Sequence, residues 1–335
     1  MASEYDAMQK RAYCVKGQPT ITSIWITDRG WLMNGSGDVG LRDIDLRRLR
    51  MFVVVMEAPS LRVAADTLFI SQQALSSAIR ELERQLGVEL FSRSRRSLTP
   101  TPAGEALYRG AVPLLAGGEQ LATQVRRVNA GAPAPFVIGH APDLASSEVF
   151  RIIEPVVLAD PSVPITVRPV FADFMRDELL SGSIDLALGR GVSAPPDMAT
   201  TIATEHELRL AVRSDHPLAA HARVDMAALA DYEIVVWGPE HEYEYTDILV
   251  GLCRRAGFEP RIILSTLLGT PPHTAVIAHP KACAFVTNEP GWIYANSIRI
   301  VEFTDPPFAP VRAMWLPNTA STLRRQILAA AEGVV

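Results

Sequence analysis

Five side chains between residues 72 and 80 have the types and the spacing needed to read DNA bases. Gln72, Gln73, Ser76, Ser77 and Arg80 recur at spacings that place them on one face of a helix. All five can donate hydrogen bonds. Glutamine can bond adenine through two atoms, arginine can do the same with guanine, and serine suits either a base or a phosphate. The chemistry that this face predicts is hydrogen bonding to base edges in a major groove.

Hydroxyl and basic side chains on both sides of this face suit the sugar–phosphate backbone. Guanidinium groups bind phosphates and also enter a narrow minor groove. Taken alone, a polar helix face is more often merely solvated, so the interpretation depends on the sequence around it. The additional predicted DNA contacts are Ser60, Arg62, Ser71, Arg93, Arg95 and Arg96.

Three short helices are expected to position this face. Apolar residues recur at helical spacing over 46–56, 61–68 and 75–86, and a residue able to cap a helix precedes each run. A tight break at 69–71 joins the last two helices, as in a helix-turn-helix. Two short extended pieces follow over 89–101 and would form a wing. The expected capping residues are Asp45, Ser60 and Ser71.

A long helix is expected over 101–129, where a capping residue, a first-turn proline and an acidic residue open the segment. Leucine or valine then recurs every seven residues, which favours packing against a partner helix, although such residues usually face the core of their own domain. Pro113 and the glycine pair at 117–118 predict a bent or locally loosened helix. The predicted dimerisation residues are Leu107, Leu114, Leu121 and Val128.

Short apolar strands alternate with helical stretches from residue 136 onward, which predicts parallel strands with crossover helices and enough elements for two α/β lobes. The expected fold class is therefore multidomain, with an α winged helix-turn-helix, a long linker helix and an α/β two-lobed domain. The expected boundaries are a poorly ordered extension at 1–40, the winged helix-turn-helix at 41–100, the linker helix at 101–129, a hinge at 130–135 and the two-lobed domain at 136–335, with lobe I at 136–207 and 306–335 and lobe II at 208–305.

Charge is distributed unevenly along the chain. The net charge is −5, but residues 41–130 carry +4 and residues 131–335 carry −9. Because each phosphate contact needs a cation, only the first of these regions is expected to meet DNA. A surplus of this size is weak evidence when taken alone, since many solvated surfaces reach it by chance.

Several other classes of protein find little support. The sequence contains no GxSxG, P-loop or HExxH motif and no zinc-binding cysteine cluster, so we expect neither catalytic residues nor a metal or cofactor. No apolar run is long enough to span a membrane, and we expect a cytoplasmic, nucleoid-associated protein. Burial is the simpler expectation for the thiols of Cys253 and Cys283, and oxidation sensing is left open.

The segment from Ile44 to Leu107 closely resembles the amino-terminal signature of LysR-type transcriptional regulators. The resemblance rests on the pair Ala64-Ala65, on 71–76, on 82–93 and on 101–104, and it continues more loosely at 138–139, 182–187 and 216–219. Gln73 stands where the family usually has proline, and Pro59 stands where it usually has glycine. We expect these departures to alter sequence preference rather than to abolish DNA binding.

The resemblance implies a homodimer or homotetramer that binds double-stranded DNA at a pseudo-palindromic operator, with RNA polymerase as a further possible partner. It also implies a periplasmic-binding-protein-like domain that holds a small-molecule effector between its lobes, at the carboxyl ends of strands. The predicted effector-binding residues are His140, Asp143, Ser146, Ser147, Trp237, Gly238, His241 and Thr270. They include no arginine or lysine, so a carboxylate effector would rest mainly on the N–H groups of the helix start near Ser147.

Two alternatives remain open at this stage. The chain could be a solute-binding or enzymatic α/β protein with a vestigial amino-terminal domain, which would bind a metabolite without affinity for duplex DNA. It could also be a constitutive DNA-binding protein without an effector, which no ligand would stabilise.

Overall fold

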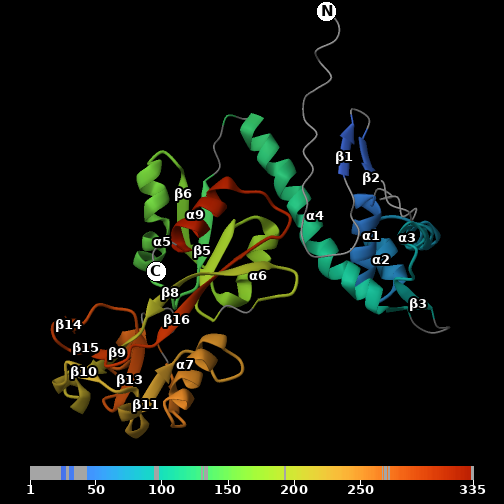
Figure 1. The fold of residues 1–335 in the computed structure, drawn as a ribbon. Helices are drawn as coiled ribbons and strands as arrows, with labels where there is room; N and C mark the ends of the chain where they lie inside the picture. Colours follow the sequence, from blue (N-terminus) through green and yellow to red (C-terminus); the bar gives the residue numbers. More distant parts are fainter. Residues whose placement is uncertain are drawn as a thin grey trace, which may run out of the picture.

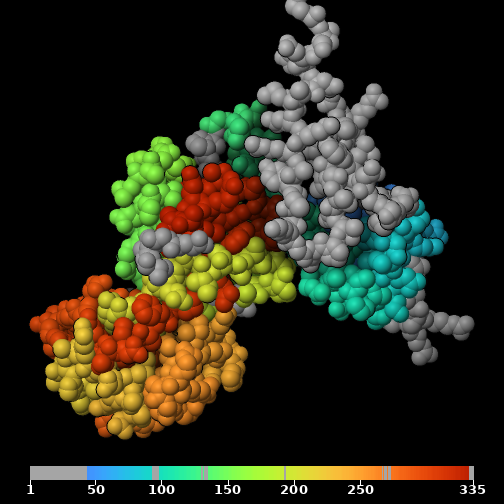
Figure 2. All heavy atoms as spheres, in the orientation of Figure 1, coloured from blue at the N-terminus to red at the C-terminus, as the bar shows by residue number. Residues whose placement is uncertain are grey.

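The computed structural model describes residues 24–27, 30–33, 44–93, 98–129, 131, 135–191, 194–265, 267, 270 and 272–332. Figure 1 shows three parts in chain order: a small helical domain, the long helix α4, and a domain built of two lobes. Figure 2 shows the surfaces of the two lobes in contact, with lobe II below lobe I. Among the described residues, no helix is long and apolar enough to cross a membrane.

The amino-terminal domain consists of α1 (Leu46–Glu57), α2 (Leu61–Thr67) and α3 (Gln72–Leu86). The three predicted caps are confirmed, because the side chains of Asp45, Ser60 and Ser71 accept hydrogen bonds from N–H groups of the first turns, at 2.9, 3.2 and 3.1 Å. Gly87 ends α3 in the left-handed region, with φ 71°. The helices enclose a core in which Leu49, Phe52, Leu75 and Leu82 are fully buried.

A two-stranded wing follows α3, with β3 (Phe91–Arg93) paired antiparallel to β4 (Leu98–Pro100). Glu83 on α3 holds the base of the wing, because its carboxylate accepts hydrogen bonds from the N–H groups of Leu90 and Phe91 at 3.0 and 3.3 Å. The ring of Phe91 packs on that of Phe52, with 5.6 Å between centroids. The wing is therefore anchored to the helical core.

The long helix α4 (Pro102–Asn129) runs without interruption through Pro113 and the glycine pair. Thr101 caps it by accepting a hydrogen bond from the N–H of Gly104 at 3.0 Å. On one side α4 packs against α1, where Arg50 and Glu119 form an ion pair at 2.6 Å. Farther along, Gln120 donates to the carbonyl of Leu179 in lobe I at 2.7 Å. Helix α4 thus connects the two domains through contacts with both.

We expect Gly104→Ala to loosen the junction between the wing and α4. A Cβ at residue 104 would lie 2.2 Å from the carbonyl oxygen of Leu90, which is backbone and cannot rotate away. Overpacking of this kind costs about 1–3 kcal/mol of unfolding free energy, measurable by urea denaturation. Gly110→Ala in the same helix is the control, because a Cβ there meets nothing within 4 Å. Equal stability of the two variants would contradict this close approach.

Lobe I is built on a five-stranded sheet in the order β6-β5-β7-β16-β8. The parallel strands β5, β6 and β7 follow the predicted strand–helix alternation, whereas β16 pairs antiparallel with both β7 and β8. The strands are β5 (Phe136–His140), β6 (Ile165–Pro169), β7 (Leu186–Gly189), β8 (Ala199–Glu207) and β16 (Phe308–Trp315), and the helices are α5 (Ser146–Ala159), α6 (Ala172–Ser181) and α9 (Thr322–Glu332).

Lobe II is built on a second mixed sheet in the order β10-β15-β9-β13-β11-β12, with β14 paired to β15. Strand β9 runs antiparallel to both of its neighbours. The elements are β9 (Arg209–Arg213), β10 (Arg223–Val224), β11 (Glu233–Val236), β12 (Arg261–Leu264), β13 (Ala282–Val286), β14 (Gly291–Ile293), β15 (Ile298–Phe303), α7 (Glu244–Arg255), α8 (Pro272–Ala275) and the 3-10 helices Pro217–Ala220 and Met226–Asp231.

The structure differs from the sequence-based description of the fold at three points. Both large sheets are mixed rather than parallel. The chain crosses from lobe I to lobe II at β9 and back to lobe I at β16, and each of these strands runs antiparallel to its neighbours. Strand β8, with the sequence ATTIATEHE, is too polar to stand out as a strand. The 1–40 segment, expected to lack a fold, contains an antiparallel pair of strands, β1 (Ile24–Thr27) and β2 (Gly30–Met33).

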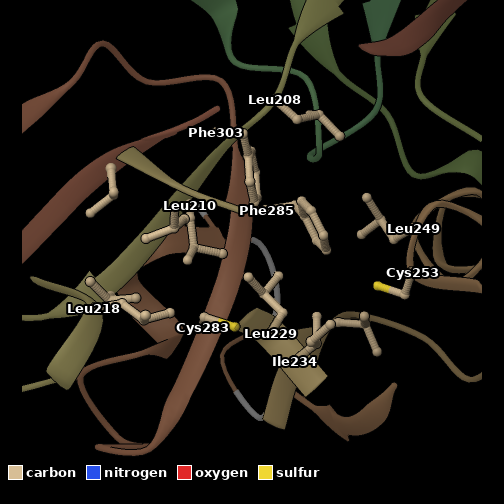
Figure 3. Close-up of a cluster of buried hydrophobic side chains, with 14 of the residues drawn as sticks. Leu208, Leu210, Leu218, Leu229, Ile234, Leu249, Cys253, Cys283, Phe285 and Phe303 are labelled. Carbon is tan, nitrogen blue, oxygen red and sulfur yellow. The ribbon is translucent and has the colours of Figure 1, made fainter. Parts of the chain in front are cut away.

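The two thiols singled out in the sequence lie inside lobe II. Figure 3 shows Cys253 and Cys283 within the cluster that contains Phe285 and Phe303. Both cysteines are free and fully buried, and burial raises the pKa of Cys253 to about 12 and that of Cys283 still further. Thiols that are neither exposed nor ionised react slowly with oxidants, so both act as apolar core residues.

Candidate nucleic-acid interface and interlobe site

The predicted base-reading face of α3 lies on the surface of the molecule. Gln72, Gln73, Ser77 and Arg80 are exposed and Ser76 is half-buried. Leu75, Ile79 and Leu82 on the opposite side of the helix are buried in the domain core. Arg80 donates to the hydroxyl of Ser76 at 3.1 Å, which aligns the two side chains along the helix. In the part of the chain that the structure describes, these donors are reachable from outside.

The flanking residues divide into two groups. Ser60, Arg62 and Ser71 are exposed, and the two serine hydroxyls accept cap hydrogen bonds while their own O–H groups can still donate to phosphate. Arg93 belongs to β3, but its side chain, like the whole of Arg95 and Arg96, lies outside the described residues. The predicted contacts of these three arginines therefore stay predictions.

The predicted dimerisation residues on α4 do not all lie on the surface. Leu107 packs against the core of its own amino-terminal domain. Leu114, Leu121 and Val128 are exposed by 38%, 61% and 74%, and Val125, which the seven-residue spacing misses, is exposed by 61%. An apolar stripe therefore lies along the later part of α4, on the surface of this chain.

The predicted effector residues of lobe I gather at the carboxyl end of β5. His140 and Asp143 are buried, and His140 Nε2 lies 3.3 Å from the hydroxyl of Ser146. Ser146 and Ser147 are exposed at the first turn of α5. These four residues share one loop and helix start, as the sequence predicts.

The predicted residues of lobe II are more scattered. Trp237 is half-buried and Gly238 is buried after β11, where Tyr243 packs so closely that a Cβ on Gly238 would lie 2.6 Å from Tyr243 Cβ. His241 points outward with a side chain 83% exposed. Thr270 hydrogen-bonds to Leu267 and Thr274 within its own region. Among the described residues, no hydrogen bond joins His241 or Thr270 to the loop of lobe I.

A buried ion pair that the sequence analysis did not identify lies beside this loop. Arg190, just after β7, donates to Glu148 Oε1 at 2.5 Å and to the carbonyl of Asp143 at 2.5 Å, and both charged side chains are at most 4% exposed. His206 Nδ1 lies 3.0 Å from Glu148 Oε1. Burial raises the pKa of Glu148, but the hydrogen bond from His206 and the charge of Arg190 outweigh it and leave that pKa well below its usual range.

The predicted effector-binding residues include no arginine or lysine, yet the structure places Arg190 beside their loop. A usable signal was present, because Arg190 directly follows the carboxyl end of the predicted strand at 184–189, where ligand-binding residues of α/β sheets gather. Glu148, in contrast, reads as an ordinary first-turn acid of a helix, and its partners come from distant segments.

The two lobes meet at this point. Tyr243 of lobe II donates to Asp143 Oδ2 at 3.4 Å, and Arg312 of lobe I bonds Glu244 at 3.3 Å. A Cβ on Gly191 would lie 2.0 Å from the backbone nitrogen of Tyr245. Burial raises the pKa of Asp143 to about 7 against the opposing charge of Arg190, and burial likewise raises the pKa values of Tyr243 and Tyr245. The two lobes are thus in direct contact around a set of buried polar groups.

A carboxylate and histidine cluster at the start of α7 resembles a cation site in composition only. Glu240, His241 and Asp247 lie close together, but the two ring nitrogens of His241 face different carboxylates, each at 3.8 Å. Glu240 is also bound by Arg254 at 2.6 Å. Because a metal would bind a single ring nitrogen, the arrangement fits surface ion pairs better than a coordination site.

Two family models match the chain, one over the amino-terminal domain and the other over part of the two-lobed domain. The model described as a bacterial regulatory helix-turn-helix protein of the lysR family matches residues 46–105, which cover α1 to the start of α4. The model described as the LysR substrate binding domain matches residues 130–270, which cover most of lobe I and part of lobe II.

Two curated transcriptional regulators are similar to this chain in sequence. The chain is 30% identical to the HTH-type transcriptional regulator BenM of Acinetobacter baylyi, over 65% of this chain and 72% of that protein. It is 29% identical to the uncharacterized HTH-type transcriptional regulator YnfL of Escherichia coli, over 66% and 74% of the two chains.

Solved structures support the fold. Full-length CbnR in complex with its target DNA matches with a TM-score of 0.51 and 19% identity, covering 87% of this chain and all of that one. A full-length OxyR variant from Pseudomonas aeruginosa matches with a TM-score of 0.50 and 21% identity, covering 88% and 96%. From the two matched domain models and the extent of the likeness to BenM, the chain belongs to the LysR family of transcriptional regulators, as a DNA-binding regulator with an effector-binding domain.

Proposed function

We propose that this regulator binds a pseudo-palindromic operator as a homodimer or homotetramer, reads it with the exposed face of α3, and responds to a small molecule held between its lobes. The observation that carries the proposal is the outward face of Gln72, Gln73 and Arg80 on a helix whose other side is buried. That the structurally similar CbnR has been crystallised with its target DNA supports the same use of the domain. The proposed role is regulation rather than catalysis, at the nucleoid, and contact with RNA polymerase stays a prediction.

Selection of binding sites from a random duplex library tests this function. A two-fold dimer places its recognition helices about one DNA turn apart, so the enriched sequences should contain inverted half-sites separated by about 10–10.5 base pairs between centres. Enrichment of no sequence over the starting library would contradict the proposal and favour a solute-binding or enzymatic protein.

The exposed stripe on α4 is the proposed dimer contact. Replacing both Leu121 and Val125 with aspartate should place two charges in this contact, and we expect monomers at protein concentrations where the wild type is dimeric. Because two linked half-sites add to each other's affinity, operator binding should weaken at least about a hundredfold. Analytical ultracentrifugation and gel shift give the two results. Leu158→Asp, at an exposed leucine on α5, is the control.

A further inference from the structure

The carboxylate of Glu148 occupies the place at the start of α5 where an anionic ligand would bind. Its Oε2 accepts a hydrogen bond from the N–H of Ala145 at 2.8 Å, so this helix start already holds an anion. Its Oε1 receives the Arg190 guanidinium at 2.5 Å, and Thr287 of lobe II also hydrogen-bonds it. Two donors that could hold a carboxylate effector, the N–H of Ala145 and the guanidinium of Arg190, are therefore bound by a side chain of the protein itself.

Asp143, which lies between the lobes near Glu148, has a carboxylate oxygen that lacks a hydrogen-bond donor. Its side chain is 5% exposed, and Oδ2 faces lobe II through the hydroxyl of Tyr243. Its other oxygen, Oδ1, is buried without a hydrogen-bond partner among the described residues. A buried acceptor left unpaired is costly, and a ligand that supplies a donor would remove that cost. The unpaired group in this cleft therefore requires a hydrogen-bond donor.

The charges of the cleft favour a positively charged donor. At a pH where both carboxylates are ionised and the imidazole of His206 beside Glu148 is neutral, Glu148 and Asp143 contribute two negative charges and Arg190 contributes one positive charge. Arg312 and Glu244 at the edge form an ion pair with each other and leave this balance unchanged. One monovalent cation would make the closed cleft neutral, which a low-dielectric interior favours strongly.

We propose that the interlobe site takes a small primary amine, whose ammonium group binds Asp143, and that Glu148 excludes carboxylate ligands by occupying their place. This rests on the proposed function in that it names the ligand class of the same effector site. Tyr243 lies against Asp143 in this structure, so the amine would enter when the lobes separate.

Thermal unfolding of the full-length protein with two probes of matched size tests the proposal. At pH 8 and constant ionic strength, n-propylammonium should raise the Tm of the wild type, whereas propionate should not. Asp143→Asn should lose the response to the amine. Glu148→Ala leaves Arg190 and the helix start without their anion, so this variant should gain a rise in Tm with propionate. If Glu148→Ala does not fold, Glu148→Ser, whose shorter side chain also vacates this place, receives the same two probes.

The proposal is overturned if propionate stabilises the wild type, if propylammonium does not, or if a folded Glu148 variant shows no gain with propionate. These measurements contain no DNA. Site selection from the duplex library reads DNA binding separately, so failure of the amine proposal and failure of the proposed function give different results.

Discussion

Replacing Arg190 with methionine is expected to lower the free energy of unfolding by about 3–5 kcal/mol. Methionine keeps much of the apolar volume but leaves Glu148, which is 3% exposed, without its cation. The N–H of Ala145 and His206 would still contact Glu148, but the positive charge of Arg190, which offsets most of the desolvation cost of the carboxylate, would be lost. Urea denaturation of the two proteins measures the difference.

The double variant Arg190→Met with Glu148→Leu separates charge from packing. Because it removes both charges, it should recover much of the stability that the single variant loses. A loss of the same size in both proteins would show that the packing of Arg190, rather than its pairing with Glu148, stabilises the lobe.

Asp143→Asn is expected to stabilise the protein at pH 8 relative to pH 5, by on the order of 2–4 kcal/mol. In the folded protein burial raises the pKa of Asp143 to about 7, above its ordinary value of 3.8. Between these two values the folded state binds the proton that the unfolded state has released, so this residue makes stability fall as the pH rises, and the loss is complete above about pH 7. Asparagine does not ionise and removes the loss.

The difference in unfolding free energy between wild type and variant is the quantity to compare at the two pH values. Burial lowers the pKa values of His216 and His273, so these residues make stability fall as the pH drops through about 6.5, which is the opposite trend. They are present in both proteins and cancel in the difference. A difference that is the same at pH 5 and pH 8 would contradict the assignment of a raised pKa to Asp143.

The amino-terminal domain could be predicted closely because its signals are local. Each cap residue sits next to the helix that it begins, and the alternation of buried and exposed positions on α3 follows directly from the helical period. The stripe on α4 was predicted less well. Leu107 has the right spacing but lies where the amino-terminal core covers it, and Val125 joins the stripe from outside the seven-residue pattern.

The interlobe site could be predicted only in part because its contacts join distant segments. The loop of His140 and Asp143 was found from the end of a strand, but the pairing of Glu148 with Arg190 spans 42 residues. The direction of a strand within a sheet also depends on distant segments. Nothing in the sequence of β16 shows that it runs antiparallel to β7. His241 and Thr270 follow strands as expected, yet the side chain of His241 is 83% exposed and that of Thr270 bonds Leu267.

The reading of DNA bases by α3 is tested most directly by measuring how Arg80→Ala changes binding to a selected operator and to single-base variants of it. Arg151→Ala removes an equally exposed arginine from α5 and serves as the control. We expect Arg80→Ala to lose about 1–3 kcal/mol of discrimination at one base position, while Arg151→Ala keeps the wild-type preference. Unchanged preference at every position after Arg80→Ala, with Gln72→Ala and Gln73→Ala equally silent, would contradict the assignment of α3 as the base-reading helix.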